Sequence, residues 1–170
     1  MIQKKVCMVG VFGTGKTSLV QQFVHSIFSV KYHSTVGVKI DRKVVDVAGT
    51  PVSLVLWDVA GRDETQEIPA SYLKGSHAII FVADGTRRET VDQLASLREL
   101  ARSAAGEVPS IVALNKADLK EQWVLTDRDE AALSAQGWER LRTSAKTGEG
   151  VEATFAWIAR ASLRAAGGGA

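Results

Sequence analysis

Eight consecutive residues near the N-terminus have the composition of a phosphate-binding loop. Gly10-Val11-Phe12-Gly13-Thr14-Gly15-Lys16-Thr17 matches the pattern G-x-x-x-x-G-K-[ST]. Glycines allow consecutive backbone N–H groups to turn toward one anion at a helix N-terminus. Lys16 supplies a mobile positive charge for phosphates, and the Thr17 hydroxyl is a hard oxygen suited to Mg²⁺. The segment predicts a nucleoside polyphosphate site, but it does not choose between ATP and GTP or between kinase and hydrolase.

Three further polar segments each follow an apolar run. They are Asp58-Val59-Ala60-Gly61, Asn115-Lys116-Ala117-Asp118 and Thr143-Ser144-Ala145-Lys146. Ligands of open α/β sheets sit at the carboxyl ends of the strands. We therefore expect these segments to surround the same ligand as the glycine-rich loop.

In this order and at this spacing, the four segments resemble the Ras superfamily of small GTPases, and most of all its Rab-like branch. The resemblance covers nearly the whole chain. It implies an α/β fold of the P-loop NTPase type, called a G domain, with a mostly parallel six-stranded sheet, one antiparallel strand and helices on both faces. It also implies GTP and GDP as ligands, Mg²⁺ as cofactor, and a molecular switch that hydrolyses GTP to GDP.

The resemblance assigns roles around the guanine base. Asp118 would accept two hydrogen bonds from guanine, and adenine would leave that carboxylate unsatisfied, which permits discrimination of roughly four or five powers of ten. Lys116 would lie along the purine, Asn115 would tie loops together, and Phe28 would pack on the base. The expected nucleotide-binding residues are Gly13, Thr14, Gly15, Lys16, Thr17, Ser18, Phe28, Thr35, Gly61, Asn115, Lys116, Asp118, Ser144, Ala145 and Lys146.

The resemblance also implies two switch loops. Thr35 lies in Tyr32-His33-Ser34-Thr35-Val36-Gly37, which is similar to the first switch of the family. Thr17, Thr35 and Asp58 would hold Mg²⁺, and the Gly61 N–H would reach the γ-phosphate. Loss of that phosphate would release both loops. Protein effectors, and an exchange factor or activating protein, would bind through the loops 28–38 and 58–74.

Two residues depart from the family pattern. The family usually has glutamine after Asp-x-Ala-Gly, where it orients the attacking water, and this chain has Arg62. Arginine has no acceptor for a water proton, so Arg62 either stabilises phosphoryl charge or points into solvent. Phe12 stands where many relatives have a small residue, and it either crowds the γ-phosphate or folds outward. The expected catalytic residues are Lys16, Thr35, Gly61 and Arg62, and we expect slow hydrolysis.

Three other functions remain open from the sequence. A GTP- and GDP-binding regulatory or scaffold module without hydrolysis is consistent with Arg62 and Phe12. A P-loop phosphotransferase or ATPase is disfavoured by Asp118. An interaction protein with an empty, degenerate site is disfavoured by the intact Lys16 and Thr17.

Alternating apolar runs and amphipathic stretches must position these residues. The expected strands are 6–11, 38–47, 52–57, 78–83, 111–114 and 139–142, with 38–47 and 52–57 forming an antiparallel hairpin. Helices are expected over 17–25, through a stripe at Val91, Leu94, Leu97 and Leu100, before Gly137, and from Val151 onward. Regular alternation of strand and helix indicates an α/β domain with a mainly parallel sheet.

Composition sets the remaining limits. The 170 residues suit one domain, which we place at 1–166, followed by a flexible Gly-rich tail at 167–170. Hydrophobic residues make up 45% and charged residues 24%, which is typical of globular chains, and a net charge of +2 argues against a nucleic-acid binder. A single cysteine excludes an internal disulfide and fits a reducing compartment. We expect a cytoplasmic monomer without an intrinsic membrane anchor, because the chain shows no signal peptide, long apolar stretch or C-terminal cysteine.

Overall fold

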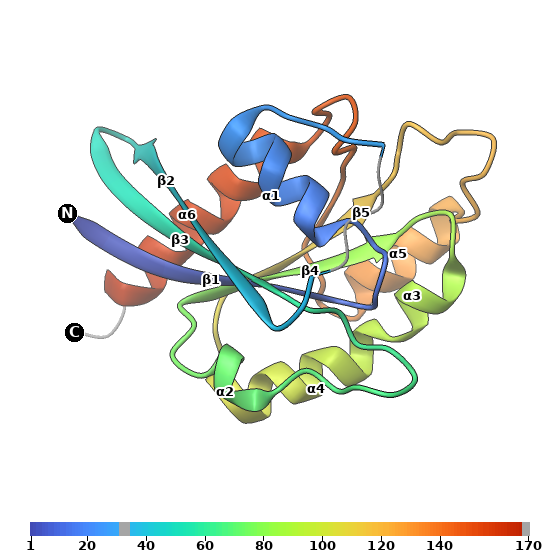
Figure 1. Cartoon of the computed structure of the whole chain (residues 1–170), viewed down its shortest axis with the longest axis horizontal. Coiled ribbons are helices and arrows are strands. Elements are labelled where there is room, and N and C mark those ends of the chain that lie inside the picture. The colour runs from blue at the N-terminus through green and yellow to red at the C-terminus, as the bar shows by residue number, and fades with distance from the viewer. Residues whose placement is uncertain (31–34, 168–170) are drawn as a thin grey trace.

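A six-stranded sheet runs through the centre of the molecule in the computed structural model, which describes residues 1–30 and 35–167 (Figure 1). The strand order is β2-β3-β1-β4-β5-β6. The strands are β1 (Ile2–Gly10), β2 (Val38–Val47), β3 (Thr50–Val59), β4 (Ala78–Asp84), β5 (Ser110–Asn115) and β6 (Arg140–Arg142). Every neighbouring pair is parallel except β2 and β3, which confirms the predicted fold class.

The antiparallel hairpin forms where the sequence predicts it. β2 and β3 pair in register from Val38 opposite Val59 to Val47 opposite Thr50. The two connecting residues, Ala48 and Gly49, both have positive φ, at 51° and 86°. Positive φ at both central positions is the geometry of a tight turn whose twist matches the flanking strands.

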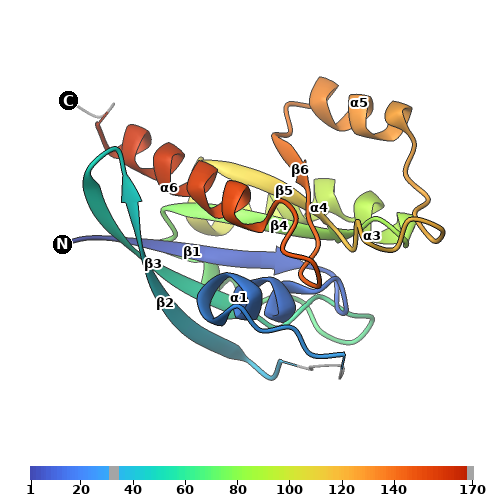
Figure 2. The same ribbon diagram turned by 90° about the horizontal axis from the view of Figure 1, so that it is seen from above.

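Helices cover both faces of the sheet. They are α1 (Lys16–His25), α2 (Ala70–Leu73), α3 (Arg88–Asp92), α4 (Leu94–Ala105), α5 (Asp127–Ala135) and α6 (Val151–Gly167). α1 and α6 lie on one side, and α2 and α4 lie on the other (Figure 1), and Figure 2 looks onto the face that carries α1 and α6. α1 and α6 pack on one face, where Phe23 stacks on Phe155 with ring centroids 3.9 Å apart. α4 packs on the other face through the buried Leu94 and Leu97, and Leu133 of α5 belongs to the same core. The central strands β1 and β4 are covered on both sides, which explains their nearly continuous apolar sequences.

Three details differ from the sequence-based expectations. The helical stripe from Val91 to Leu100 is divided between α3 and α4 by Gln93, although Leu94 and Leu97 still face the sheet. The short helix α2 was not expected, because four residues are too few to show helical periodicity. Gly167 is the last residue of α6 and therefore does not belong to the predicted tail. The other residues of that tail, 168–170, lie outside the described residues.

Within 1–30 and 35–167, no helix combines the length and apolarity that crossing a membrane requires.

The arrangement brings the predicted functional segments to one edge of the sheet. β1, β4 and β5 are parallel neighbours, and they end at Gly10, Asp84 and Asn115. Their carboxyl ends therefore meet at the same edge. The segments that follow β1 and β5 are the glycine-rich loop and the Asn115–Asp118 motif.

Candidate nucleotide-binding site

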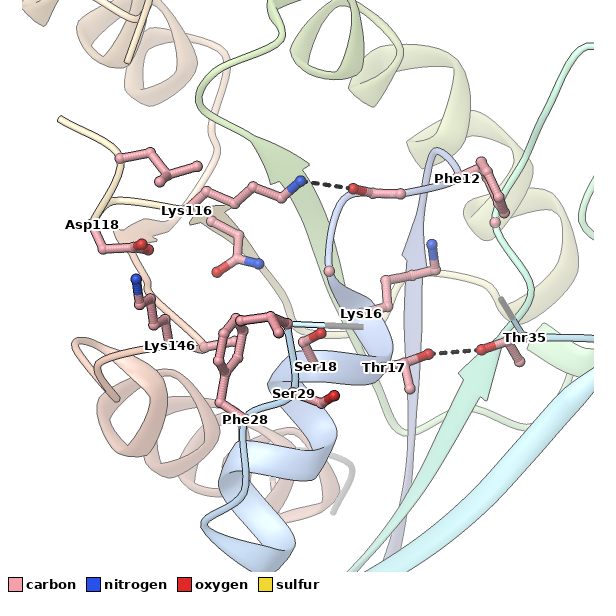
Figure 3. Close-up of a pocket in the computed structure, with 17 residues that line it drawn as sticks. Phe12, Lys16, Thr17, Ser18, Phe28, Ser29, Thr35, Lys116, Asp118 and Lys146 are labelled. Carbon is pink, nitrogen blue, oxygen red and sulfur yellow. Dashed lines mark hydrogen bonds between the residues drawn. The ribbon is translucent and has the colours of Figure 1, made fainter. Parts of the chain in front are cut away.

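A cavity of about 350 Å³ opens at this edge of the sheet. Its volume lies in the range of small-molecule pockets. All of the predicted nucleotide-binding residues line it except Thr14 and Ser144. Figure 3 shows Asp118, Lys116 and Lys146 at one end of the pocket and Lys16, Thr17 and Thr35 at the other.

The glycine-rich loop, residues 10–17, leads from β1 into the N-terminus of α1. Gly15 precedes the helix with φ at 101°, and no side chain caps the first turn. The backbone N–H groups at this helix end are therefore available to an anion. A β-carbon at Gly15 would lie 2.3 Å from Asn115 Nδ2, so the loop needs glycine here for close approach as well as for its backbone angle.

Asn115 braces this loop from β5. Its Nδ2 donates to the Thr14 carbonyl at 3.0 Å, and its Oδ1 accepts from the Thr143 hydroxyl at 3.1 Å. The residue is 2% exposed, and both ends of its amide have partners inside the protein. This geometry agrees with the tying role that the family resemblance implies for Asn115.

Lys16 places a buried ammonium group at the end of the pocket where the sequence predicts phosphates, which we call the phosphate end. Its Nζ donates to the Val11 carbonyl at 3.1 Å, and the residue is 6% exposed. Burial lowers the pKa of Lys16 to about 8, and the nearby Asp58 only partly offsets this effect. A buried cation whose burial is only partly offset by a nearby carboxylate is well suited to an anionic ligand.

Three oxygen-bearing side chains meet beside Lys16. The Thr17 hydroxyl donates to Asp58 Oδ2 at 2.7 Å and lies 2.7 Å from the Thr35 hydroxyl (Figure 3). Asp58 Oδ1 is buried and has no hydrogen-bond partner in the described part of the chain. Burial raises the pKa of Asp58 above its ordinary value, and the Thr17 hydrogen bond and the charge of Lys16 offset this rise only in part.

These three oxygens fit a hard divalent cation such as Mg²⁺, which takes oxygen ligands and retains several waters. The unpartnered Asp58 Oδ1 supports this fit, because a buried carboxylate oxygen without a donor is costly. The described residues contain no group of three or more His, Cys, Asp or Glu side chains arranged for a metal. A metal site here depends on the two threonine hydroxyls.

At the other end of the pocket, Asp118 is held by a neighbouring loop. The Ser144 hydroxyl donates to Asp118 Oδ1 at 2.7 Å, which gives Ser144 a supporting place behind the pocket wall. Thr14 also supports the wall, since it is fully buried and donates to the Val11 carbonyl at 3.0 Å. Phe28 lines the pocket and is 39% exposed.

Arg62 adopts neither of the two positions considered from the sequence. Its Nε and Nη2 pair with Glu67 at 2.8 and 2.7 Å, and its Nη1 donates to Gln93 at 3.0 Å and also to the Ser96 hydroxyl. The side chain is 16% exposed and does not line the pocket. The predicted catalytic role of Arg62 gains no support from these contacts.

Phe12 lines the phosphate end of the pocket and is 40% exposed. Its N–H donates to the Arg62 carbonyl at 2.9 Å, so the glycine-rich loop and the segment after β3 are joined through their backbones. A β-carbon at Gly61 would lie 2.6 Å from the Phe12 nitrogen and 2.7 Å from Lys16 Nζ. The close approach of these two loops therefore requires glycine at position 61.

Other residues of the site were not expected from the sequence. Ser29, Val30 and Leu119 line the pocket, and the first two directly follow Phe28. Asp84, at the end of β4, pairs with Lys116, and Arg87 donates to the Phe12 carbonyl of the glycine-rich loop. Both residues lie outside the four motif segments. Of the predicted first switch, Tyr32, His33 and Ser34 lie outside the described residues, whereas Thr35 is placed at the pocket.

Comparison with known proteins decides the family. The Ras family model matches residues 5–164. The chain belongs to the Ras family. Its relatives include Ras-related protein Rab-4B of Homo sapiens, 38% identical over 164 residues, which cover 94% of this chain and 76% of the relative. Ras-related protein Rab-1 of Theileria parva is 35% identical over 161 residues, 92% of this chain and 73% of the relative. Membership of this Rab-like part of the family makes the protein a GTP-binding switch of the GTPase class.

Proposed function

We propose that this Ras-family protein binds GTP and GDP with Mg²⁺ in the pocket at the carboxyl edge of the sheet, and that it hydrolyses GTP slowly. The proposal of slow hydrolysis rests on the position of Arg62. Its guanidinium is bound by Glu67, Gln93 and Ser96, and it brings no acceptor for the attacking water.

Backbone N–H groups and a lysine of the pocket would stabilise the negative charge that develops on the phosphates during hydrolysis. The backbone N–H groups of residues 13–17 and the Lys16 ammonium hold the phosphates, and their charges oppose the negative charge that develops during in-line attack of water. Thr17, Thr35 and Asp58 would hold Mg²⁺, which neutralises phosphate charge when it is bound. Gly61 lines the pocket, and its N–H would donate to the γ-phosphate.

Guanine selectivity rests on Asp118. Its carboxylate is oriented by Ser144 and lines the base end of the pocket with Lys116 and Ala145. Guanine offers two adjacent donors to such a carboxylate, and adenine does not. We propose that Asp118 selects guanine nucleotides, with Phe28 packed on the base.

Two measurements test this function. Equilibrium competition should show GDP displacing labelled GDP at concentrations at least a thousandfold below ADP, because an unmatched base leaves the carboxylate unpaired. Asp118→Asn should weaken GDP and favour xanthosine diphosphate, since the amide donates to the additional carbonyl of xanthine. Unchanged GDP affinity in this variant would remove the assigned role.

A second candidate function is a GTP- and GDP-binding module without hydrolysis, which the engaged Arg62 also favours. Multiple-turnover phosphate release with Mg²⁺ separates the two. A slow rate above that of a protein-free control supports hydrolysis, and no phosphate release supports the binding module. A rate equal to that of glutamine-bearing relatives would contradict both.

We further propose that effectors bind through loops 28–38 and 58–74. Val30 and Val36 are 90% and 93% exposed on the first of these loops, and Ile40 is half exposed on the adjoining β2. Exposed apolar side chains beside a nucleotide site are suited to a partner that reads the state of the switch. Pull-down with protein loaded with GDP or a non-hydrolysable GTP analogue tests this, and equal capture in both states would contradict it.

A further inference from the structure

One buried carboxylate outside the predicted site connects both ends of the pocket. Asp84 ends β4 and is 1% exposed. Its Oδ2 pairs with Lys116 Nζ at 2.8 Å and with Arg87 Nε at 3.2 Å. Its Oδ1 accepts from the Thr86 N–H at 2.8 Å and from the Thr86 hydroxyl at 2.6 Å. Both carboxylate oxygens are therefore fully used by nearby donors.

The two cations that Asp84 holds also grip the glycine-rich loop. Lys116 Nζ donates to the Gly13 carbonyl at 3.1 Å, as Figure 3 shows. Arg87 Nη2 donates to the Phe12 carbonyl at 3.0 Å. Asp84 thus fixes two consecutive carbonyls of the loop through two different side chains.

Fixing these carbonyls also orients the donors of the loop. A trans peptide is planar, and its C=O and N–H point in opposite directions. Holding the Phe12 carbonyl sets the direction of the Gly13 N–H, and holding the Gly13 carbonyl sets that of the Thr14 N–H. These N–H groups belong to the loop that would cradle the phosphates.

We propose that Asp84 is a positioning residue for nucleotide retention, acting through Lys116 at the base end and through Arg87 at the phosphate end. The inference rests on the proposed binding of GDP and GTP in this pocket. It adds a residue pair, Asp84 and Arg87, that does not contact the nucleotide in the proposed mode and lies outside the four motif segments of the sequence analysis.

The charge state of Asp84 supports this role. Burial raises the pKa of its carboxyl, but the hydrogen bonds from Lys116 and Thr86 outweigh that effect, so the pKa lies below its ordinary value. The group is ionised at neutral pH. An isosteric amide would keep the volume but remove the charge that holds Lys116 and Arg87.

The test measures the release of fluorescent GDP into excess unlabelled GDP with Mg²⁺. Asp84→Asn should release GDP roughly ten- to a hundredfold faster than the unmodified chain, the range for loss of a hydrogen bond between charged groups. Thr90→Val is the matched control. The Thr90 hydroxyl is buried and bonds only backbone atoms of Asp84 and Arg87, so its loss lowers thermal stability without touching the carboxylate.

A second pair of variants isolates the phosphate-end arm. Arg87→Met should release GDP several-fold faster, whereas Arg88→Met should not, because Arg88 pairs with Asp129 and not with Asp84. The double variant Asp84→Asn/Arg87→Met should release GDP about as fast as Asp84→Asn alone, since both changes break the same connection. Loss of stability alone would instead give no such pattern.

Each outcome has a defined meaning. Unchanged release in Asp84→Asn, or equal acceleration by Thr90→Val at matched stability, overturns the inference while leaving GDP binding intact. Multiplied effects in the double variant overturn the Arg87 arm. If Asp84→Asn does not fold, Arg87→Met compared with Arg88→Met decides. Absence of GDP binding by the unmodified chain removes the proposed function itself, and this inference with it.

Discussion

Replacing Arg62 separates its structural and catalytic contributions. In Arg62→Met the side chain keeps its length but loses its contacts with Glu67, Gln93 and Ser96. In Arg62→Gln those contacts are weakened as well, but the amide carbonyl supplies the acceptor that arginine lacks. Comparison of the two variants isolates the effect of the acceptor.

The structure sets the expected magnitudes. The pair with the half-exposed Glu67 is worth about 1 kcal/mol, and the bonds to Gln93 and Ser96 together add about 1 kcal/mol. A difference of about 2 kcal/mol corresponds to a ratio of roughly thirty to one in favour of these contacts. Arg62 therefore contributes little to intrinsic hydrolysis, and Arg62→Met should change the rate by less than about twofold. Arg62→Gln should accelerate it roughly tenfold, a modest value for a group that positions a water.

A single-turnover assay measures these rates directly. Protein is loaded with γ-labelled GTP in EDTA, excess Mg²⁺ starts the reaction, and phosphate release is followed over time. Nucleotide release measured in parallel serves as the control for unchanged binding. A tenfold slower Arg62→Met would show that the guanidinium does reach the phosphate, and it would refute the reasoning from its observed contacts.

Three further outcomes follow from other contacts. Thr17→Ala should make GDP retention much less dependent on Mg²⁺, seen as equal release with EDTA and with Mg²⁺; a preserved Mg²⁺ effect would contradict the metal site. Gly85→Ala would place a methyl group 2.0 Å from the Trp123 ring, so the melting temperature should fall, and Gly85→Ala/Trp123→Leu should recover part of the loss; an unchanged melting temperature in the single variant would contradict this packing. The hydrogen bond from Arg142 lowers the pKa of Glu130 in the folded protein below its ordinary value of 4.5. The ionised carboxylate therefore stabilises the fold at pH values above 4.5, and this stabilisation is lost as the pH falls below 4.5 toward the pKa of the folded protein. Glu130→Gln should therefore melt lower than the unmodified chain at pH 7, and the difference should shrink below pH 4.5; a constant difference would contradict the assignment.

Local sequence determined much of the fold and the phosphate end of the site. The residues 10–17 are contiguous, so their glycines, lysine and threonine fix a loop and a helix start without help from distant parts of the chain. The hairpin of β2 and β3 follows from two alternating runs joined by a short turn. Because ligands lie at the carboxyl ends of parallel strands, the sequence also predicts that the segments at the ends of β3 and β5 lie at the same edge of the sheet.

Tertiary packing decided what the individual side chains do there. Arg62 finds partners at positions 93 and 96, and Arg87 meets the carbonyl of Phe12, which lies 75 positions away in sequence. No local pattern encodes such pairs, because the position of each side chain depends on how whole strands and helices come together. None of the sequence motifs includes Asp84, and its proposed role depends on β4 ending between the two strands, β1 and β5, whose loops line the pocket.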